Sequence, residues 1–306
     1  MKINRRDFIT TTALAGTNLM LNSLDAFAHP VSQPAQAGYS LLVLATNWGF
    51  SGSWDEFCAK AKTAGYDGCE IWWPGDATER KKLFEALTRH NLKIGFLYGS
   101  GEKDFSKHET QFYQFLADAA ATRPLYLNCH SGKDYFTADQ KEKLINHSIK
   151  VSAQSGVPVY HETHRGRGLY SVPVTEELLR RVPGLRLTLD ISHWCNVHES
   201  YLDDQAEAVN LALSRTDHIH ARIGHPEGPQ VNDPRAPEWE HALKTHFAWW
   251  DKVVAEKKQA GKQMTCLTEF GPIDYMPALP YTRQPVADQW AINVHMKDVL
   301  RSRYSK

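Results

Sequence analysis

The chain has 306 residues, of which 42% are hydrophobic, so it is long enough to bury the core of one large domain. Its 35 basic and 35 acidic residues balance. Such a balance lacks the positive surface of nucleic-acid-binding proteins, so we expect no nucleic acid as a partner and favour a neutral small molecule.

The N-terminal segment has the features of an export signal. Arg5 and Arg6 precede a short stretch rich in Ala, Leu and Thr, and a small-x-small cleavage site follows at Ala26-Phe-Ala28. This order predicts a twin-arginine signal peptide over residues 1–28, a linker over 29–38, and a periplasmic or exported protein. A disordered basic N-terminus is the alternative. The apolar stretch is too short and too polar for a stable membrane span, and no other segment approaches one.

Eight short apolar runs follow the linker, and helix-like segments separate them. This alternation predicts an α/β fold with one (β/α)₈ TIM barrel over residues 39–306, a size that fits barrels of about 250 residues. A two-domain nucleotide-binding fold is disfavoured, because its glycine fingerprint is missing. The predicted strands are Leu41–Thr46, Gly68–Trp72, Leu92–Leu97, Leu125–Cys129, Val157–Glu162, Leu185–Asp190, Asp217–His220 and Met264–Glu269.

Capping residues and long loops mark the segments between the strands. Ser53 is a candidate N-cap for a helix over residues 54–64, and Thr137 for a helix that ends before Gly156. The connections over residues 223–237 and 271–285 are rich in Pro and long for a compact barrel. Both follow strands on the side where barrel enzymes place their sites, so they could form walls or a lid over a pocket, or simply decorate the surface.

Polar side chains end four consecutive predicted strands: Glu162, Asp190, His220 and Glu269. The carboxyl ends of parallel barrel strands meet at one rim, where barrel enzymes carry their chemistry. A lone acid at a strand end usually caps a helix, but four in succession indicate a shared site. Three carboxylates and one imidazole are hard ligands, so the pattern predicts one divalent metal ion, with Mn²⁺ preferred and Mg²⁺, Co²⁺ or Zn²⁺ as alternatives.

The predicted metal site suits the removal of a proton from carbon. A metal that holds a carbonyl and its neighbouring hydroxyl acidifies the hydrogen between them and stabilises the resulting enediolate. Glu162 and Glu269 lie on strands separated by two others, so they could flank a ligand, remove the proton and return it. The sequence leaves open which glutamate is the acid and which is the base.

Other polar and aromatic side chains gather at the same strand ends. Arg222 could grip a substrate oxygen or pair with an acid of a loop. His161 is out of phase with Glu162, so we expect it to face the helices, and His218 lies deeper than His220, as a core histidine. Large aromatics also fill barrels, so they are weaker evidence. The candidate substrate contacts are His193, Arg222, His130, His164 and Trp72.

Five segments together resemble the xylose isomerase-like barrel superfamily, in its sugar phosphate isomerase/epimerase branch. They are Gly65-Tyr-Asp-Gly-Cys-Glu-Ile71, His161-Glu-Thr-His-Arg-Gly-Arg167, Asp190-Ile-Ser-His193, His218-Ile-His220 and Thr268-Glu-Phe-Gly271. The resemblance covers essentially everything after the leader.

Relatives in this superfamily imply roles for the matching residues. The resemblance makes Glu162, Asp190, His220 and Glu269 the metal ligands and the two glutamates the acid/base pair. It also implies that His193 contacts the substrate, as does an arginine after the seventh strand. Arg222 stands closer to His220 than the family's arginine does, so contacts from that loop depart from the pattern.

The leading hypothesis is a metal-dependent sugar isomerase or epimerase, with a small sugar or glycoside as substrate. A 3-keto-glycoside lyase is the alternative, because the same enolate could expel an aglycone by β-elimination. A non-catalytic sugar-binding module is the alternative from another class. The sequence identifies neither the substrate nor the native metal, and it leaves open whether the protein is a homo-oligomer.

The superfamily also includes endonuclease IV, a trinuclear zinc enzyme that acts on abasic DNA. His130, His193 and the four predicted ligands would satisfy part of its ligand set. Its Asp-x-His pair after the seventh strand is missing here, where the chain has Asn232-Asp-Pro-Arg235. Together with the balanced charge, this makes a nuclease the least favoured function.

Overall fold

The eight predicted strands are present and form a closed parallel barrel in chain order. The structure is a computed structural model that describes residues 38–305. Strand β1 pairs with β2 on one side and with β8 on the other, which closes the sheet. The predicted (β/α)₈ fold is confirmed. The strands are β1 Ser40–Thr46, β2 Gly68–Trp72, β3 Lys93–Tyr98, β4 Leu127–Cys129, β5 Val159–Glu162, β6 Leu187–Leu189, β7 Thr216–His220 and β8 Gln263–Thr268.

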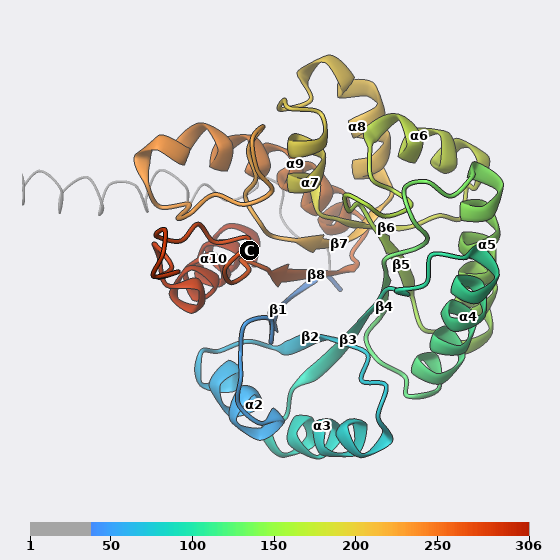
Figure 1. The fold of residues 1–306 in the computed structure, drawn as a ribbon, viewed down its shortest axis with the longest axis horizontal. Helices are drawn as coiled ribbons and strands as arrows, with labels where there is room; N and C mark the ends of the chain where they lie inside the picture. The colour runs from blue at the N-terminus through green and yellow to red at the C-terminus, as the bar shows by residue number, and fades with distance from the viewer. Residues whose placement is uncertain (1–37, 306) are drawn as a thin grey trace, which may run out of the picture.

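Helices surround the barrel and follow the strands in turn, as the colour sequence in Figure 1 shows. Both predicted caps are present: Ser53 and Thr137 each form a capping box at the start of α2 and α5. The helices are α2 Trp54–Thr63, α3 Ala77–His90, α4 Phe105–Ala121, α5 Ala138–Ser155, α6 Val172–Arg181, α7 Ile191–Val197, α8 Ala206–Ser214, α9 Glu240–Gln259 and α10 Gln289–Tyr304, with short 3₁₀ turns η1 Asp203–Gln205 and η2 Pro237–Trp239.

Strand boundaries differ from the predicted ones by one or two residues, and two of these differences affect the site. Asp190 and Glu269 lie just after β6 and β8 rather than within them. Asp190 is the N-cap of α7, and its side chain accepts a hydrogen bond from the backbone N–H of Ser192. At the opposite end, β5 begins only at Val159, because Pro158 has no N–H to donate to the sheet.

An apolar plug fills the lower interior of the barrel. Leu44, Tyr126 and Leu267 form a small buried cluster of their own. Because β1 and β8 are not neighbours of β4, this cluster can only form across the barrel interior. Gly95 on β3 makes room for it, since a Cβ there would lie 2.5 Å from the Tyr126 ring. Leu267 stands two residues before Glu269, so the plug lies one layer of side chains below the polar strand ends.

The larger apolar core lies between the outer faces of the strands and the helices. Phe96, Phe112 and Trp250 are among its fully buried side chains. All five cysteines are buried and free. The predicted signal peptide and all but the last residue of the predicted linker lie outside the described residues. Within residues 38–305, no helix combines the length and hydropathy needed to cross a bilayer.

Candidate active site

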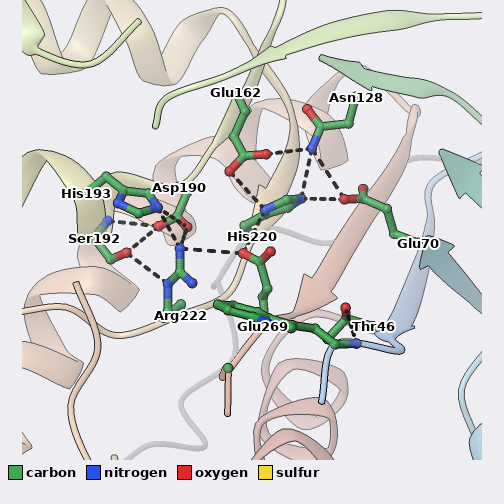
Figure 2. Close-up of polar contacts among 12 residues, drawn as sticks. Thr46, Glu70, Asn128, Glu162, Asp190, Ser192, His193, His220, Arg222 and Glu269 are labelled. Carbon is green, nitrogen blue, oxygen red and sulfur yellow. Dashed lines mark hydrogen bonds and ion pairs between the residues drawn. The ribbon is translucent and has the colours of Figure 1, made fainter. Parts of the chain in front are cut away.

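The four predicted metal ligands meet at the carboxyl end of the barrel. Ligand atoms of Glu162, Asp190, His220 and Glu269 all lie within 4.8 Å of one another. Glu162, Asp190 and His220 are at most 1% exposed, and Glu269 is 7% exposed. Figure 2 shows Glu162 and Glu269 on opposite sides of the His220 ring. Four strand ends therefore build one buried cluster.

The cluster contains polar atoms that fit a bound cation. His220 Nδ1 lies 2.9 Å from Glu269 Oε2 and 3.6 Å from Glu162 Oε1. The 2.9 Å contact does not have hydrogen-bond geometry, and neither Nδ1 nor Oε2 has a hydrogen-bond partner among the described residues. Buried polar atoms without partners are rare and costly. A divalent ion with oxygen and imidazole ligands would satisfy both of these atoms.

Negative charge exceeds positive charge around His220. Burial alone would lower the pKa of His220, but the carboxylates of Glu269, Glu162 and Glu70 raise it well above its usual range. Burial raises the pKa of Asp190 to about 6 in spite of the neighbouring Arg222 guanidinium. Without a metal, His220 thus serves as a cation among acids. A divalent ion would supply that charge instead, and its binding would release the His220 proton.

Arg222 lies inside the cluster rather than at its edge. Its Nη2 donates to Asp190 Oδ2, lies 2.8 Å from His193 Nε2, and is 3.6 Å from Glu269 Oε2. The sequence left open whether Arg222 contacts a substrate or pairs with an acid of a loop. In the structure its ion-pair partner is Asp190, a predicted metal ligand. Ser192 donates to the other oxygen of Asp190. Both Asp190 oxygens are therefore already engaged by protein groups.

Aromatic rings form an arc over the cluster. The ring of Trp72 lies 5.2 Å from that of His130, which is 4.5 Å from His164, which is 3.8 Å from His193. Burial lowers the pKa of His164 and His193 well below the usual range, so both are neutral at pH 7. Trp72 stays 47% exposed at the outer end of the arc. Four of the five predicted substrate contacts thus lie in one row, and the fifth, Arg222, lies inside the cluster.

The two long loops meet above the site. Tyr275 of the 271–285 loop places its ring 4.7 Å from the Arg222 guanidinium and 4.8 Å from the Trp48 ring. Gln230 of the 223–237 loop accepts from Gly271 N at 2.6 Å and donates to Gly271 O at 3.2 Å. The 271–285 loop therefore forms a wall of the site at Arg222, and Gln230 joins the 223–237 loop to its first residue.

A separate groove of about 550 Å³ lies beside α2 and α3, away from the cluster. Its charged lining is already paired: Asp55 lies 2.7 Å from Arg89, and Glu79 lies 2.7 Å from Lys82. It includes none of the four predicted ligands. The chemistry of the side chains, not the size of a hollow, places the candidate site at the barrel mouth.

Comparison with known proteins agrees with this architecture. The model of the xylose isomerase-like TIM barrel family matches residues 58–253. The chain belongs to this family.

One curated relative of this xylose isomerase-like barrel is an inosose dehydratase from Mesomycoplasma hyopneumoniae. It is 28% identical over 197 residues, which cover 56% of this chain and 62% of the relative. Similar solved structures include a 3-keto-D-glucoside 4-epimerase from E. coli, at 14% identity and a TM-score of 0.56, covering 86% of this chain and all of that one. A D-allulose 3-epimerase from Methylomonas, solved with D-allulose, has 16% identity and a TM-score of 0.59, covering 90% of this chain and all of that one.

Two buried residues of this xylose isomerase-like barrel escaped the sequence analysis. Glu70 on β2 and Asn128 on β4 both contact His220, at 3.0 and 3.1 Å from its Nε2. Each stands two residues before a predicted substrate contact, Trp72 and His130, and so shares its face of the strand. This spacing of two residues could have identified Glu70 as part of the site. A carboxylate in the run Gly-Cys-Glu-Ile-Trp is unfavourable on a buried apolar face, so it indicates a polar one.

His161 and His218 lie on the strand faces that the two-residue period of a strand predicts. His161 faces α5, where its Nε2 lies 2.7 Å from Ser148 Oγ. His218 is fully buried below His220, with its Nδ1 2.8 Å from Thr265 Oγ1. Both predictions are confirmed, and neither residue belongs to the cluster around the predicted metal.

Proposed function

We propose that this protein is a divalent-metal-dependent enzyme that removes a proton from the carbon next to a carbonyl of a sugar, giving an isomer or epimer. The observation that carries the proposal is the pair of buried glutamates. Glu162 and Glu269 approach His220 Nδ1 from different strands, at 3.6 and 2.9 Å. Two carboxylates that face one another across a ligand position can serve as base and acid.

The residues that would hold the metal are Glu162, Asp190, His220 and Glu269, and a divalent ion bound there supplies polarisation of a substrate carbonyl. One glutamate takes the proton from carbon, and the electron pair moves toward the carbonyl oxygen. Return of a proton to the same carbon from the other glutamate inverts its configuration and gives an epimer. Return to the former carbonyl carbon gives an isomer, provided that the neighbouring hydroxyl loses its proton to become the new carbonyl and the former carbonyl oxygen gains one.

Side chains around the cluster of four predicted ligands suit the binding of a polyol. Arg222 can donate hydrogen bonds to a substrate oxygen, and neutral His164 and His193 can donate or accept. Trp72 offers a partly exposed indole on which the C–H face of a sugar can stack. The wall formed by Tyr275 limits the access of water to the reacting carbon.

A second outcome, β-elimination, is favoured by the 28% identity to a dehydratase, a kind of enzyme that expels water. It begins with the same proton removal, but the electron pair then expels a group from the next carbon. In an oxidised glycoside that group is the aglycone. We propose this lyase reaction as the second candidate, and a sugar-binding module without turnover as the outcome if neither reaction occurs.

The deciding experiment uses the full chain loaded with Mn²⁺, incubated in D₂O with free sugars and with 3-keto-glycosides. We expect deuterium at the carbon next to the carbonyl, in an epimer or isomer. A released aglycone or an unsaturated product would instead establish elimination. The variant Glu269→Gln should abolish both while leaving the fold intact. Ligand binding without deuterium exchange in the wild type would overturn the enzymatic proposal.

A further inference from the structure

Glu70 occupies the centre of the barrel and is only 2% exposed. Its Oε1 lies 3.0 Å from His220 Nε2, and its Oε2 lies 3.1 Å from His218 Nε2. The hydroxyl of Tyr126 donates to Oε2 at 2.8 Å. Burying a carboxylate is costly unless hydrogen bonds replace its water, so this side chain needs the donors around it.

The position of Asn128 shows which nitrogen atoms donate hydrogen bonds to Glu70. Its Nδ2 lies 2.9 Å from Glu162 Oε2 and 3.3 Å from Glu70 Oε1. Both carboxylate oxygens only accept, so the amide nitrogen must face them, and its two hydrogens are used. His220 Nε2, 3.1 Å from the same nitrogen, therefore has no donor left on Asn128. Nε2 must carry its own hydrogen and donate it to Glu70.

We propose that Glu70 is a positioning residue for the cation site. By accepting the Nε2 hydrogen, it holds the His220 ring with Nδ1 toward Glu162 and Glu269, so that a bound cation would take the Nδ1 lone pair. Figure 2 shows the ring between Glu70, Glu162 and Glu269. Metal-binding histidines characteristically donate their other ring N–H to such a partner. Asn128 extends the same support to Glu162. This inference rests on the proposed metal site and goes beyond it.

A competing role for Glu70 is that of a metal ligand itself, because ligand atoms of Glu70, His218 and His220 lie within 4.8 Å of one another. The hydrogen bonds of Glu70 argue against it. Asn128 and His220 donate to Oε1, and Tyr126 donates to Oε2, so both oxygens are already engaged by protein donors. His218 does not add a ligand position on this side, because its Nδ1 lies 3.0 Å from the backbone oxygen of Thr265, which can only accept, and its Nε2 faces the Tyr126 hydroxyl.

The test measures Mn²⁺ affinity of the full chain by chelator competition, without any substrate. Glu70→Ala removes the acceptor of the His220 Nε2 hydrogen, so we expect roughly 10- to 100-fold weaker binding. Glu70→Gln keeps one acceptor oxygen for that hydrogen and should lose less than Glu70→Ala. Tyr126→Phe is the matched control, because it removes a donor from the oxygen remote from His220, and its affinity should stay within about twofold of the wild type.

Nuclear magnetic resonance of ¹⁵N-histidine-labelled, Zn²⁺-loaded wild type gives an independent reading that needs no variant to fold. We expect Nδ1 of His220 on the metal and a hydrogen on Nε2. Metal bound through Nε2, or a folded Glu70→Ala variant with wild-type affinity, would overturn the proposal. Tight Mn²⁺ binding with no turnover would instead count against the proposed function alone, and a wild type that binds no metal would overturn both.

Discussion

The two halves of the barrel contribute to the site in different ways. Strands β5 to β8 end in the four predicted metal ligands, and ligand atoms from all four lie within 4.8 Å of one another. Strands β1 to β4 supply Glu70 and Asn128 around His220 and Glu162, with the rings of Trp72 and His130 above. Under the proposed function, the β5–β8 half would supply the metal ligands, and the β1–β4 half would orient them and face the substrate.

Removing a ligand from the β5–β8 half should have the largest effect. Asp190→Asn replaces a carboxylate by a neutral amide beside Arg222, and we expect Mn²⁺ affinity to fall by more than about 100-fold, beyond the effect of outer partners. Metal content of purified protein, by mass spectrometry, checks this. The exposed Asp203→Asn is the control and should keep its metal. If Asp190→Asn retains one ion per chain, the ligand assignment fails.

A residue on the outer face of β5 should affect stability but not metal. Burial lowers the pKa of His161 to about 3, whereas an unfolded histidine titrates near 6.5. The unfolded state thus binds the proton first, so this stabilisation is complete above pH 6.5 and is lost as pH falls toward 3. Between pH 7.5 and 5 we expect a loss of about 2 kcal/mol from this residue.

Urea unfolding of wild type and His161→Gln at both pH values measures that loss. The variant lacks the titrating ring, so the stability difference between the two proteins should shrink on acidification. Mn²⁺ affinity at pH 7.5 should not change, in contrast to Glu162 variants one residue away. A constant stability difference would show that His161 does not titrate as described.

In the β1–β4 half, Asn128→Ala should weaken the site without destroying it. The variant loses the 2.9 Å donor to Glu162 and the 3.3 Å donor to Glu70, but no predicted metal ligand. We expect roughly tenfold lower metal affinity, at the lower end of the range for outer partners. The exposed Asn146→Ala serves as control in the same titration. A loss as large as that of Asp190→Asn would erase the distinction between the halves.

The smallest effect should come from Trp72, at the outer end of the arc. Trp72→Ala removes a stacking surface worth about 0.5–1.5 kcal/mol, so KM should rise about 2- to 10-fold with kcat nearly constant. Tyr135→Ala, an aromatic residue that is 62% exposed, is the control. A fall in kcat with unchanged KM would place Trp72 in the chemistry rather than in binding.

The fold and the four predicted metal ligands could be placed from the sequence, because both depend on short-range periodicity. Apolar runs predict the strands, and the polar residue at the end of a run predicts the carboxyl end of the barrel. This second prediction tolerates an error of one or two residues in the strand boundary. Asp190 and Glu269 moved out of their strands, yet they kept their place in the cluster, because the residue after a strand still starts at the same rim.

The partners of those residues could not be predicted, since they depend on register between strands and on side-chain rotamers. Glu70 meets His220 across the barrel interior, 150 positions away in the chain, and nothing local to either residue shows it. The pairing of Arg222 with Asp190 likewise depends on the curvature of two loops. Tyr275 lies in a loop without periodicity, so only its position in space shows that it covers Arg222.

The double hydrogen bond between Gln230 and Gly271 links two loops that enter the site from different strands. Because one side-chain amide holds both backbone atoms of Gly271, neither loop can withdraw from the mouth without breaking the same pair of bonds. A substitution at Gln230 would therefore act on both loops at once, because it would release the 223–237 loop and, through Gly271, the loop that carries Tyr275.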